Sequence, residues 1–271
     1  MKKYSKIISA SIILALVVSM YGCFGNSEKQ STESNTNTEV SESESSIQTE
    51  AAMSEVPIEL YTVEIKQETL ENEAYTANLI YPQVTGYSDR EIEVKVNALI
   101  YSYVSKKMNT SISLTGADSG INYDIESFNV TYKGEKFISA LCRGSVYVEG
   151  NAYVTGFAYG INIDFAGAKL VGFDSIVDYN GFKTGFTNGE FKLTRGYEQL
   201  LDETNFSDII SQYDPLYSIY PEFYVKQTDN GINLGVITDT IHVLGDVAEF
   251  EASVEDKKYM TDYFNDLTNA D

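Results

Sequence analysis

The sequence predicts a single α+β domain over residues 57–271, built as an antiparallel β-sheet meander with about three helices packed on it. Three observations predict this fold. Apolar residues alternate with period two between residues 121 and 171, with short glycine-bearing turns between the runs. One segment, residues 89–108, carries a helix start signal and a helical apolar repeat. The remaining strands and helices fall into separate runs, which is typical of α+β domains.

The domain begins with two strands and the most clearly marked helix. Residues 58–65 and 73–81 are rich in Ile, Val, Tyr and Leu, and Pro82 closes the second run. Ser88 and Glu91 then have the spacing of a capping box, in which Ser88 accepts first-turn amides and Glu91 reaches back. The apolar residues of the helix recur at helical spacing: Ile92, Val96, Leu99, Ile100 and Tyr103.

The meander occupies the middle of the chain. Its turns are short, and two of them contain Gly134 and Gly150. A parallel sheet would need crossover helices between these runs, and the turns leave no room for them. The sequence therefore predicts antiparallel neighbours over the runs 121–132, 137–148, 153–165 and 170–171.

The segment from residue 173 to 195 is glycine-rich and aromatic, and Thr187-Asn188-Gly189 favours a hairpin there. Helical spacing returns over residues 197–204, and a second short helix is expected over 206–213. Further strands are predicted at 223–227, 232–237 and 247–254. A last helix should begin at Ser253 or Asp256 and present an apolar face of Tyr259, Met260, Tyr263, Phe264 and Leu267.

The chain opens on a secretory leader. Three lysines precede an apolar run at residues 7–18, and Gly22 is followed by Cys23. This end of the leader resembles the bacterial lipobox, which implies a lipoprotein signal peptide over residues 1–22 and a lipid on Cys23. The alternatives are an ordinary signal peptide and an uncleaved anchor. An anchor is disfavoured because the apolar run is shorter than the roughly 20 residues that cross a bilayer core.

Residues 23–56 differ sharply in composition from residues 57–271. They are rich in Ser, Thr and Glu and offer few apolar side chains to offset the entropy of ordering, so a disordered acidic tether is expected. A flexible chain of this length would hold the domain about 30 Å from its anchor. The expected location is therefore the outer face of the cell membrane, lipid-anchored and extracytoplasmic.

The charge of the chain narrows the classes of partner. Removing the leader takes three of the nineteen Lys and Arg and none of the forty Asp and Glu, so the formal net charge falls from −21 to −24. Such a chain repels nucleic acid and anionic lipid headgroups and attracts basic proteins. Plain solubility is an equally good explanation of the acidity.

Few residues suggest catalysis, and the sequence predicts no catalytic residue, no metal site and no cofactor. Cys142 lies in an apolar run, where a buried structural thiol is expected. His242 is the single histidine and is expected on a strand or its connecting loop in a structural role. Phosphate-loop and dinucleotide fingerprints are absent. Forty carboxylates make a glycosidase-type acid pair arithmetically available, and the tyrosines favour cross-strand packing over sugar stacking.

Several stretches resemble one envelope family. This family contains the extracytoplasmic domain of the lysozyme-sensing sigma-V anti-sigma factor and the N-terminal non-catalytic domain of peptidoglycan deacetylase C. The similar features, which span about residues 58–254, are Tyr81-Pro82-Gln83-Val84 with Asn97, the turn from Asn162 to Leu170, Phe173 to Val177, Phe223 to Ile232 and Gly245 to Phe250. Residues 151–158 lack the family's glycine-alanine-histidine pattern.

The resemblance implies an α+β fold without enzymatic activity and a role at the cell envelope. A basic protein such as lysozyme is one implied partner, and a cell-wall glycan is the other. No sigma-binding segment or deacetylase domain is expected in this chain, and no contact residues are implied. Two other functions stay open: a hydrolase that uses a carboxylate pair, and a solute-binding lipoprotein of a transporter.

Overall fold

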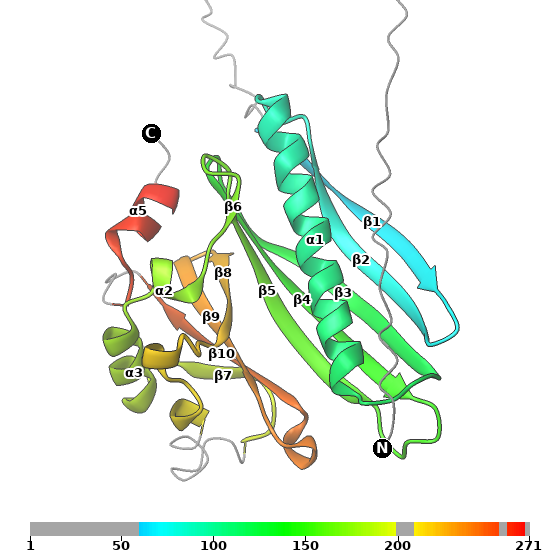
Figure 1. The fold of residues 1–271 in the computed structure, drawn as a ribbon. Helices are drawn as coiled ribbons and strands as arrows, with labels where there is room; N and C mark the ends of the chain where they lie inside the picture. Colours follow the sequence, from blue (N-terminus) through cyan, green and yellow to red (C-terminus); the bar gives the residue numbers. More distant parts are fainter. Residues whose placement is uncertain (1–59, 199–208, 255–258, 269–271) are drawn as a thin grey trace, which may run out of the picture. The chain divides into compact units, whose positions relative to one another are not determined.

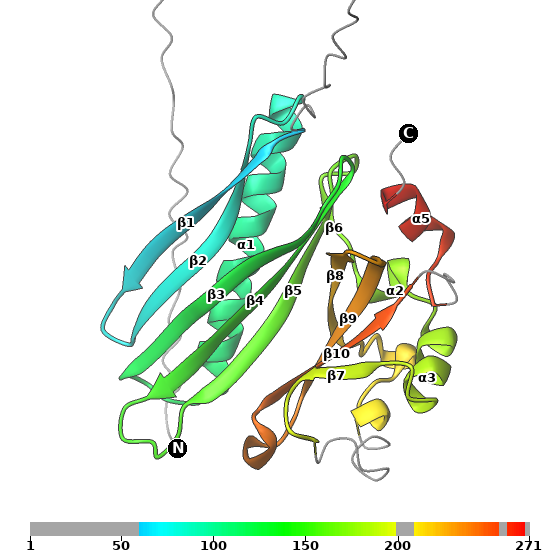
Figure 2. The same cartoon turned by 180° about the vertical axis from the view of Figure 1, so that it is seen from behind.

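The computed structural model describes residues 60–198, 209–254 and 259–268, which form two β-sheets with helices against them (Figures 1 and 2). The predicted signal peptide, the lipid site at Cys23 and the tether lie outside the described residues, as does most of the helix expected over 197–204. Within the described parts of the chain, no helix is long and apolar enough to span a membrane.

The first sheet has six strands in sequence order: β1 (Thr62–Glu71), β2 (Tyr75–Thr85), β3 (Ile121–Lys133), β4 (Phe137–Val148), β5 (Thr155–Asp164) and β6 (Lys169–Leu170). Strands β3 to β6 form the predicted antiparallel meander. Strands β2 and β3 are parallel instead, with Tyr75 opposite Ile121, because helix α1 (Arg90–Leu114) connects them as a crossover. The predicted meander begins at residue 121, so this parallel pair lies outside it and makes the sheet mixed.

Helix α1 begins one residue later and ends six residues further on than the sequence predicts. The Asp89 carboxylate, not Ser88, accepts hydrogen bonds from the first-turn amides of Glu91 and Ile92. The predicted capping box of Ser88 and Glu91 was therefore wrong. The Glu91 side chain pairs with Lys95 on the next turn instead.

Strand β2 does not stop at Pro82, although the sequence predicts that it should. Strand β3 pairs with β2 only up to Asn78, so Pro82 has a hydrogen-bonded neighbour on one side alone, where Ile65 of β1 lies opposite. Proline is tolerated in such an edge-like position. Beyond it, the side chain of Asn97 in α1 both donates to and accepts from the backbone of Val84, at 2.8 Å each, which fixes the helix to the strand.

The second sheet has the order β7-β10-β9-β8, formed by β7 (Lys192–Arg195), β8 (Glu222–Thr228), β9 (Gly231–Asp239) and β10 (Val247–Ser253). Helices α2 (Phe173–Ile176), α3 (Tyr179–Thr187) and α5 (Asp262–Thr268) contribute to its core. Two 3-10 helices, η2 (Pro215–Tyr217) and η3 (His242–Leu244), lie in its connections. The described helices are thus more numerous than the three expected.

The hairpin expected around residues 187–189 is absent, because α3 occupies the segment before it. Asp178 caps this helix by accepting from the amides of Asn180 and Gly181. The aromatic side chains of Phe182 and Phe186 are fully buried on its inner face. Residues 209–211 are helical within the second predicted helix of this region, whose first part is not described.

The outer edge of β8 is covered by polar side chains of the first sheet. Asn162 of β5 donates to the Phe223 carbonyl at 2.9 Å, and Thr131 of β3 donates to the Val225 carbonyl at 2.6 Å. Ser139 of β4 accepts from the Val225 amide at 2.8 Å. An uncovered strand edge leaves backbone groups unpaired, so these three side chains satisfy the edge while joining the two sheets.

The sheets stack so that the start of β4 is buried on both faces. Ile138, Ala140 and Cys142 pack with α1 residues in one core. Phe137 belongs to the core of the second sheet, and Leu141 packs against Tyr224 and Ile237 between the sheets. A strand buried on both faces reads as a continuous apolar run, which explains the pattern from residue 137 to 142.

A buried ion pair also links the sheets. Arg143 of β4 contacts both carboxylate oxygens of Glu249 in β10, at 2.5 and 2.6 Å, and the Glu249 side chain is 1% exposed. Bidentate pairing of this kind fixes orientation as well as charge. These hydrogen bonds raise the pKa of the Arg143 guanidinium.

Candidate functional site

The sequence singled out Cys142 and His242, and the structure places them in different environments. Cys142 is fully buried, and burial raises the pKa of its thiol to about 12, so the thiolate is scarce at neutral pH. This confirms the predicted buried thiol. His242 lies on η3 in the connection from β9 to β10 and is exposed, so the predicted connecting-loop position is confirmed. Within the described residues, no group of His, Cys, Asp and Glu has a metal-binding arrangement.

The buried carboxylates make structural contacts. Glu249 pairs with Arg143, and the Asp164 carboxylate accepts from the Tyr263 hydroxyl at 2.7 Å. Glu93 is 3% exposed and contacts Arg90 while accepting from the Tyr87 amide. Carboxylates held this way have their lone pairs occupied, which suits a scaffold more than proton transfer.

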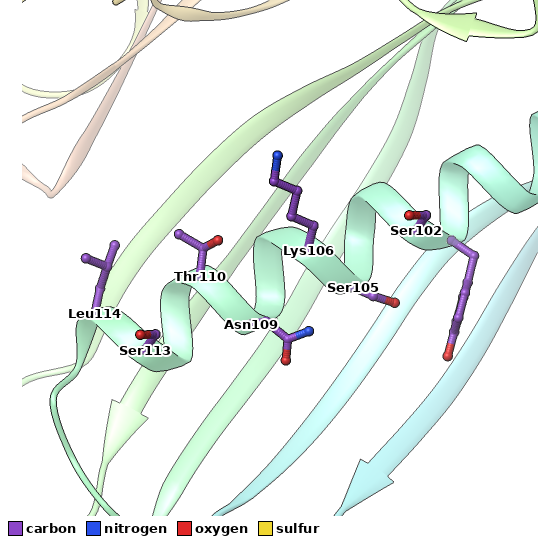
Figure 3. A pocket seen from close by; sticks show the side chains of 8 residues that line it. Ser102, Ser105, Lys106, Asn109, Thr110, Ser113 and Leu114 are labelled. Atoms are coloured by element: carbon purple, nitrogen blue, oxygen red, sulfur yellow. The ribbon is translucent and has the colours of Figure 1, made fainter. Parts of the chain in front are cut away.

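Helix α1 bears a wide groove of 740 Å³ along its outer side (Figure 3). Its lining is mostly hydroxyl and amide side chains, with one cation at Lys106. All the lining residues come from one helix, and their side chains leave it in several directions along its length, so their polar groups do not converge on a point (Figure 3). The lining consists of Tyr101, Ser102, Ser105, Lys106, Asn109, Thr110, Ser113 and Leu114.

A smaller pocket of 380 Å³ lies where α1, the β5–β6 hairpin and the start of β8 meet, and we call it the junction pocket. Residues from several elements line it, including the four aromatic residues Tyr103, Phe173, Tyr220 and Phe223 and the carboxylate of Glu222. Nearby, at the end of β9, the pKa of the exposed Asp239 is raised, first by desolvation and then by the charge of Glu222, while Lys107 opposes the shift. Sequence reasoning gave no sign of this grouping.

A third surface lies at the connection between β9 and β10. The Asp246 carboxylate accepts from the Gly156 amide of β5 at 2.8 Å and lies 2.9 Å from Nδ1 of His242. The ring of Tyr153 packs on the His242 ring, with centroids 4.7 Å apart. Asp246 thus fixes the β9–β10 connection against the start of β5. Its backbone lies in the left-handed region, with a φ of 63°.

Apolar side chains project into solvent from the β4–β5 and β9–β10 connections. Tyr153 is 68% exposed, Ile241 66% and Val243 76%, and Val154 beside them is 49% exposed. We call residues 149–154 and 240–246 the loop tip. Grouped exposed apolar residues of this kind often mark an interaction site.

The charge around the loop tip is negative. Glu149 and Asp246 lie within its two segments, which contain neither Lys nor Arg. The adjoining segment 115–120 adds Asp118, and its Gly120 carbonyl accepts from the Glu149 amide at 2.8 Å. The surface therefore combines exposed apolar side chains with carboxylates, which fits a basic partner.

The loop tip lies at one end of the first sheet, and strand β1 begins at the opposite end. Thr62 at the start of β1 pairs with Thr85, just before α1 begins. The loop tip joins the other end, where Val148 pairs with Ile121 after α1 has ended. Both figures show β1 and α1 beginning at the upper end and the β9–β10 connection at the lower one (Figures 1 and 2).

Sequence reasoning missed the loop tip because Ile241 and Val243 alternate with polar neighbours, as in a strand. The signal that favours a connection is the pair Gly245 and Asp246, which both take positive φ and accompany the 3-10 turn. Exposure of the apolar side chains results from that turn.

Fold and site together define an α+β domain with two mostly antiparallel sheets and an apolar, acidic loop tip. Two solved structures of similar arrangement are DUF3298 family proteins, a domain of unknown function. The one from Bacteroides fragilis has a TM-score of 0.45 and 11% identity, over 74% of this chain and 94% of that one. The one from Pseudomonas aeruginosa PAO1 has a TM-score of 0.46 and 9% identity, over 78% and 98%. No family model matches the sequence. No curated protein matches it either.

Proposed function

We propose that this chain is a cell-surface lipoprotein, anchored through Cys23, whose α+β domain binds a basic protein such as lysozyme without catalysis. The observation that carries the proposal is the loop tip, where exposed apolar residues are accompanied by carboxylates and by no Lys or Arg within its two segments. A few well-packed side chains near the centre of an interface, often Tyr, carry most of its affinity, and complementary charge speeds encounter and selects the partner.

The position of the loop tip supports a protein partner over the bilayer. The proposed tether joins the domain at the β1 end, so the loop tip lies at the end away from the attachment. The net charge of −24 expected after removal of the leader disfavours contact with anionic headgroups in any case. A cell-wall glycan remains the other partner that the sequence suggests, and nothing in the loop tip favours it.

The double variant Ile241→Ser/Val243→Ser is expected to weaken binding of hen lysozyme at least tenfold, because both side chains would lose apolar contact area. The measurement is calorimetry with residues 57–271 at two salt concentrations. Parent affinity should fall at the higher salt, since salt screens the attraction between exposed charges.

The matched control is Leu216→Ser/Tyr217→Ser, which removes two side chains that are 89% and 77% exposed on η2, outside the loop tip. Its affinity should equal that of the parent. If the Ile241 and Val243 variant bound equally well, the loop tip would be the wrong surface. If the parent failed to bind lysozyme at either salt concentration, lysozyme would be the wrong partner.

The alternative, a hydrolase with a carboxylate pair, has one observation in its favour. The pKa of Asp239 is raised, first by desolvation and then by the charge of Glu222, and a carboxyl with a raised pKa is what the general acid of such catalysis requires. If the chain is such a hydrolase, soluble fragments released from a peptidoglycan preparation should disappear with Asp239→Asn and persist with the exposed control Glu73→Gln. Absence of release by the parent chain would leave this alternative without support.

A further inference from the structure

The junction pocket is a concave site, and it is separate from the projecting loop tip. Its floor is formed by β5 at Gly160 and Asn162, and β8 closes one side at Glu222 and Phe223. Tyr103 of α1 contributes a wall. A volume of 380 Å³ is within the range of small-molecule sites, and the walls come from elements held by the Asn162 hydrogen bond to the Phe223 carbonyl.

Aromatic rings form much of this lining. Tyr220 stacks on Phe173, with centroids 5.9 Å apart and planes at 24°. Tyr220 also meets Tyr179 edge to face at 6.2 Å, so its ring is supported from behind. Tyr103 lines the α1 side of the pocket. Ring faces so placed attract cations as well as apolar groups.

One ammonium group of the protein already rests against this lining. Lys107 Nζ pairs with the Glu222 carboxylate and lies 5.3 Å from the centroid of the Tyr103 ring and 5.6 Å from that of Tyr159. The Tyr103 hydroxyl donates to the second carboxylate oxygen of Glu222 at 3.3 Å. The combination of carboxylate and ring faces therefore stabilises an ammonium ion in this structure.

Glu222 is the carboxylate among the residues that line the pocket, and it also raises the pKa of Asp239 nearby, after desolvation, while Lys107 opposes that shift. Glu222 keeps 37% of its side chain exposed although it contacts Lys107 and Tyr103. Part of the Glu222 side chain is thus reached from solvent at the pocket, although each carboxylate oxygen already has one partner.

We propose that the junction pocket binds an organic ammonium group carried on a small ligand, with Glu222 as its counter-charge and Tyr103, Tyr220 and Phe173 around its apolar body. Two sources share this chemistry: the side chain of a lysine and the amine of an amino sugar. The site is independent of the loop tip, so it goes beyond the proposed function and can fail without it.

The test is an NMR titration of the full chain with two pairs of probes. N-acetyl-lysine amide is compared with the neutral N-acetyl-norleucine amide, which has the same four-carbon side chain without the ammonium group, and glucosamine is compared with glucose. We expect one or both cationic probes to saturate resonances of the pocket residues and the neutral partners to bind at least tenfold more weakly. The two pairs tell a lysine side chain from an amino sugar.

Glu222→Gln removes the charge while keeping the size of the side chain and should weaken the cationic probe at least tenfold. Glu73→Gln, at an exposed position in the β1–β2 turn, is the control and should bind as the parent does. Equal binding of cationic and neutral probes to the parent would overturn the proposal, as would no saturation by any probe. These results need no variant, so the proposal stays testable if Glu222→Gln unfolds.

Discussion

Replacing Gly160 by alanine is expected to destabilise the protein by about 3 kcal/mol or more, the upper end of the cost of overpacking. A Cβ atom at this position would lie 1.6 Å from the carbonyl oxygen of Phe223 and 2.6 Å from its carbon. Both atoms belong to the backbone of β8, so no rotamer change can relieve the clash. The two sheets would have to separate where Asn162 holds β8.

Thermal unfolding followed by circular dichroism would measure this effect. A loss of 3 kcal/mol lowers the Tm of a domain of this size by roughly 6–12 °C. Gly156→Ala is the matched control in the same strand, since its Cβ would lie 3.6 Å from the nearest atom of Asp246, an ordinary contact. If Gly160→Ala melted within a degree or two of Gly156→Ala, the close approach of β5 and β8 would be wrong.

Replacing Arg143 by methionine is expected to cost about 3 kcal/mol, because it leaves the carboxylate of Glu249 buried without its main partner. Arg195 lies 3.8 Å from Glu249 and is mostly exposed, so it compensates little. Chemical denaturation with urea measures the change in the free energy of unfolding.

A second substitution separates the net contribution of the ion pair to stability from the cost of leaving one buried charge unpaired. Arg143→Met/Glu249→Gln should be more stable than Arg143→Met alone, since the uncompensated charge is removed as well. The surface pair Lys95 and Glu91 provides the control, and Lys95→Met should change stability far less than Arg143→Met does, because both side chains are exposed. Equal losses for Lys95→Met and Arg143→Met would contradict the buried position of Glu249.

The local patterns in the sequence were sufficient for most individual elements. Period-two alternation located β3 to β5, because a strand places successive side chains on opposite faces. The repeat from Ile92 to Tyr103 located α1. Errors fell where two local signals competed, as at Ser88 and Asp89, either of which can cap a helix. The sequence predicts a hairpin around residues 187–189, where α3 ends, because the burial of the α3 aromatic side chains against the second sheet cannot be inferred from their spacing.

The candidate surfaces could not be predicted in the same way. Ile241 and Val243 have the spacing of strand residues, and their exposure depends on a turn that Asp246 fixes from another part of the chain. The junction pocket likewise requires Tyr103 and Glu222, 119 residues apart, to meet. No local pattern records such a contact.

By itself, the sequence determined the α+β class, the antiparallel meander, the long helix and the acidity, because each depends on composition or on the order of neighbouring residues, while the leader stays a prediction. Only the tertiary structure decided that there are two sheets, that β2 and β3 run parallel, and that Asn162, Ser139 and Thr131 cover the edge of β8. These features depend on contacts between residues distant in sequence, whose pairing is set by the packing of whole elements.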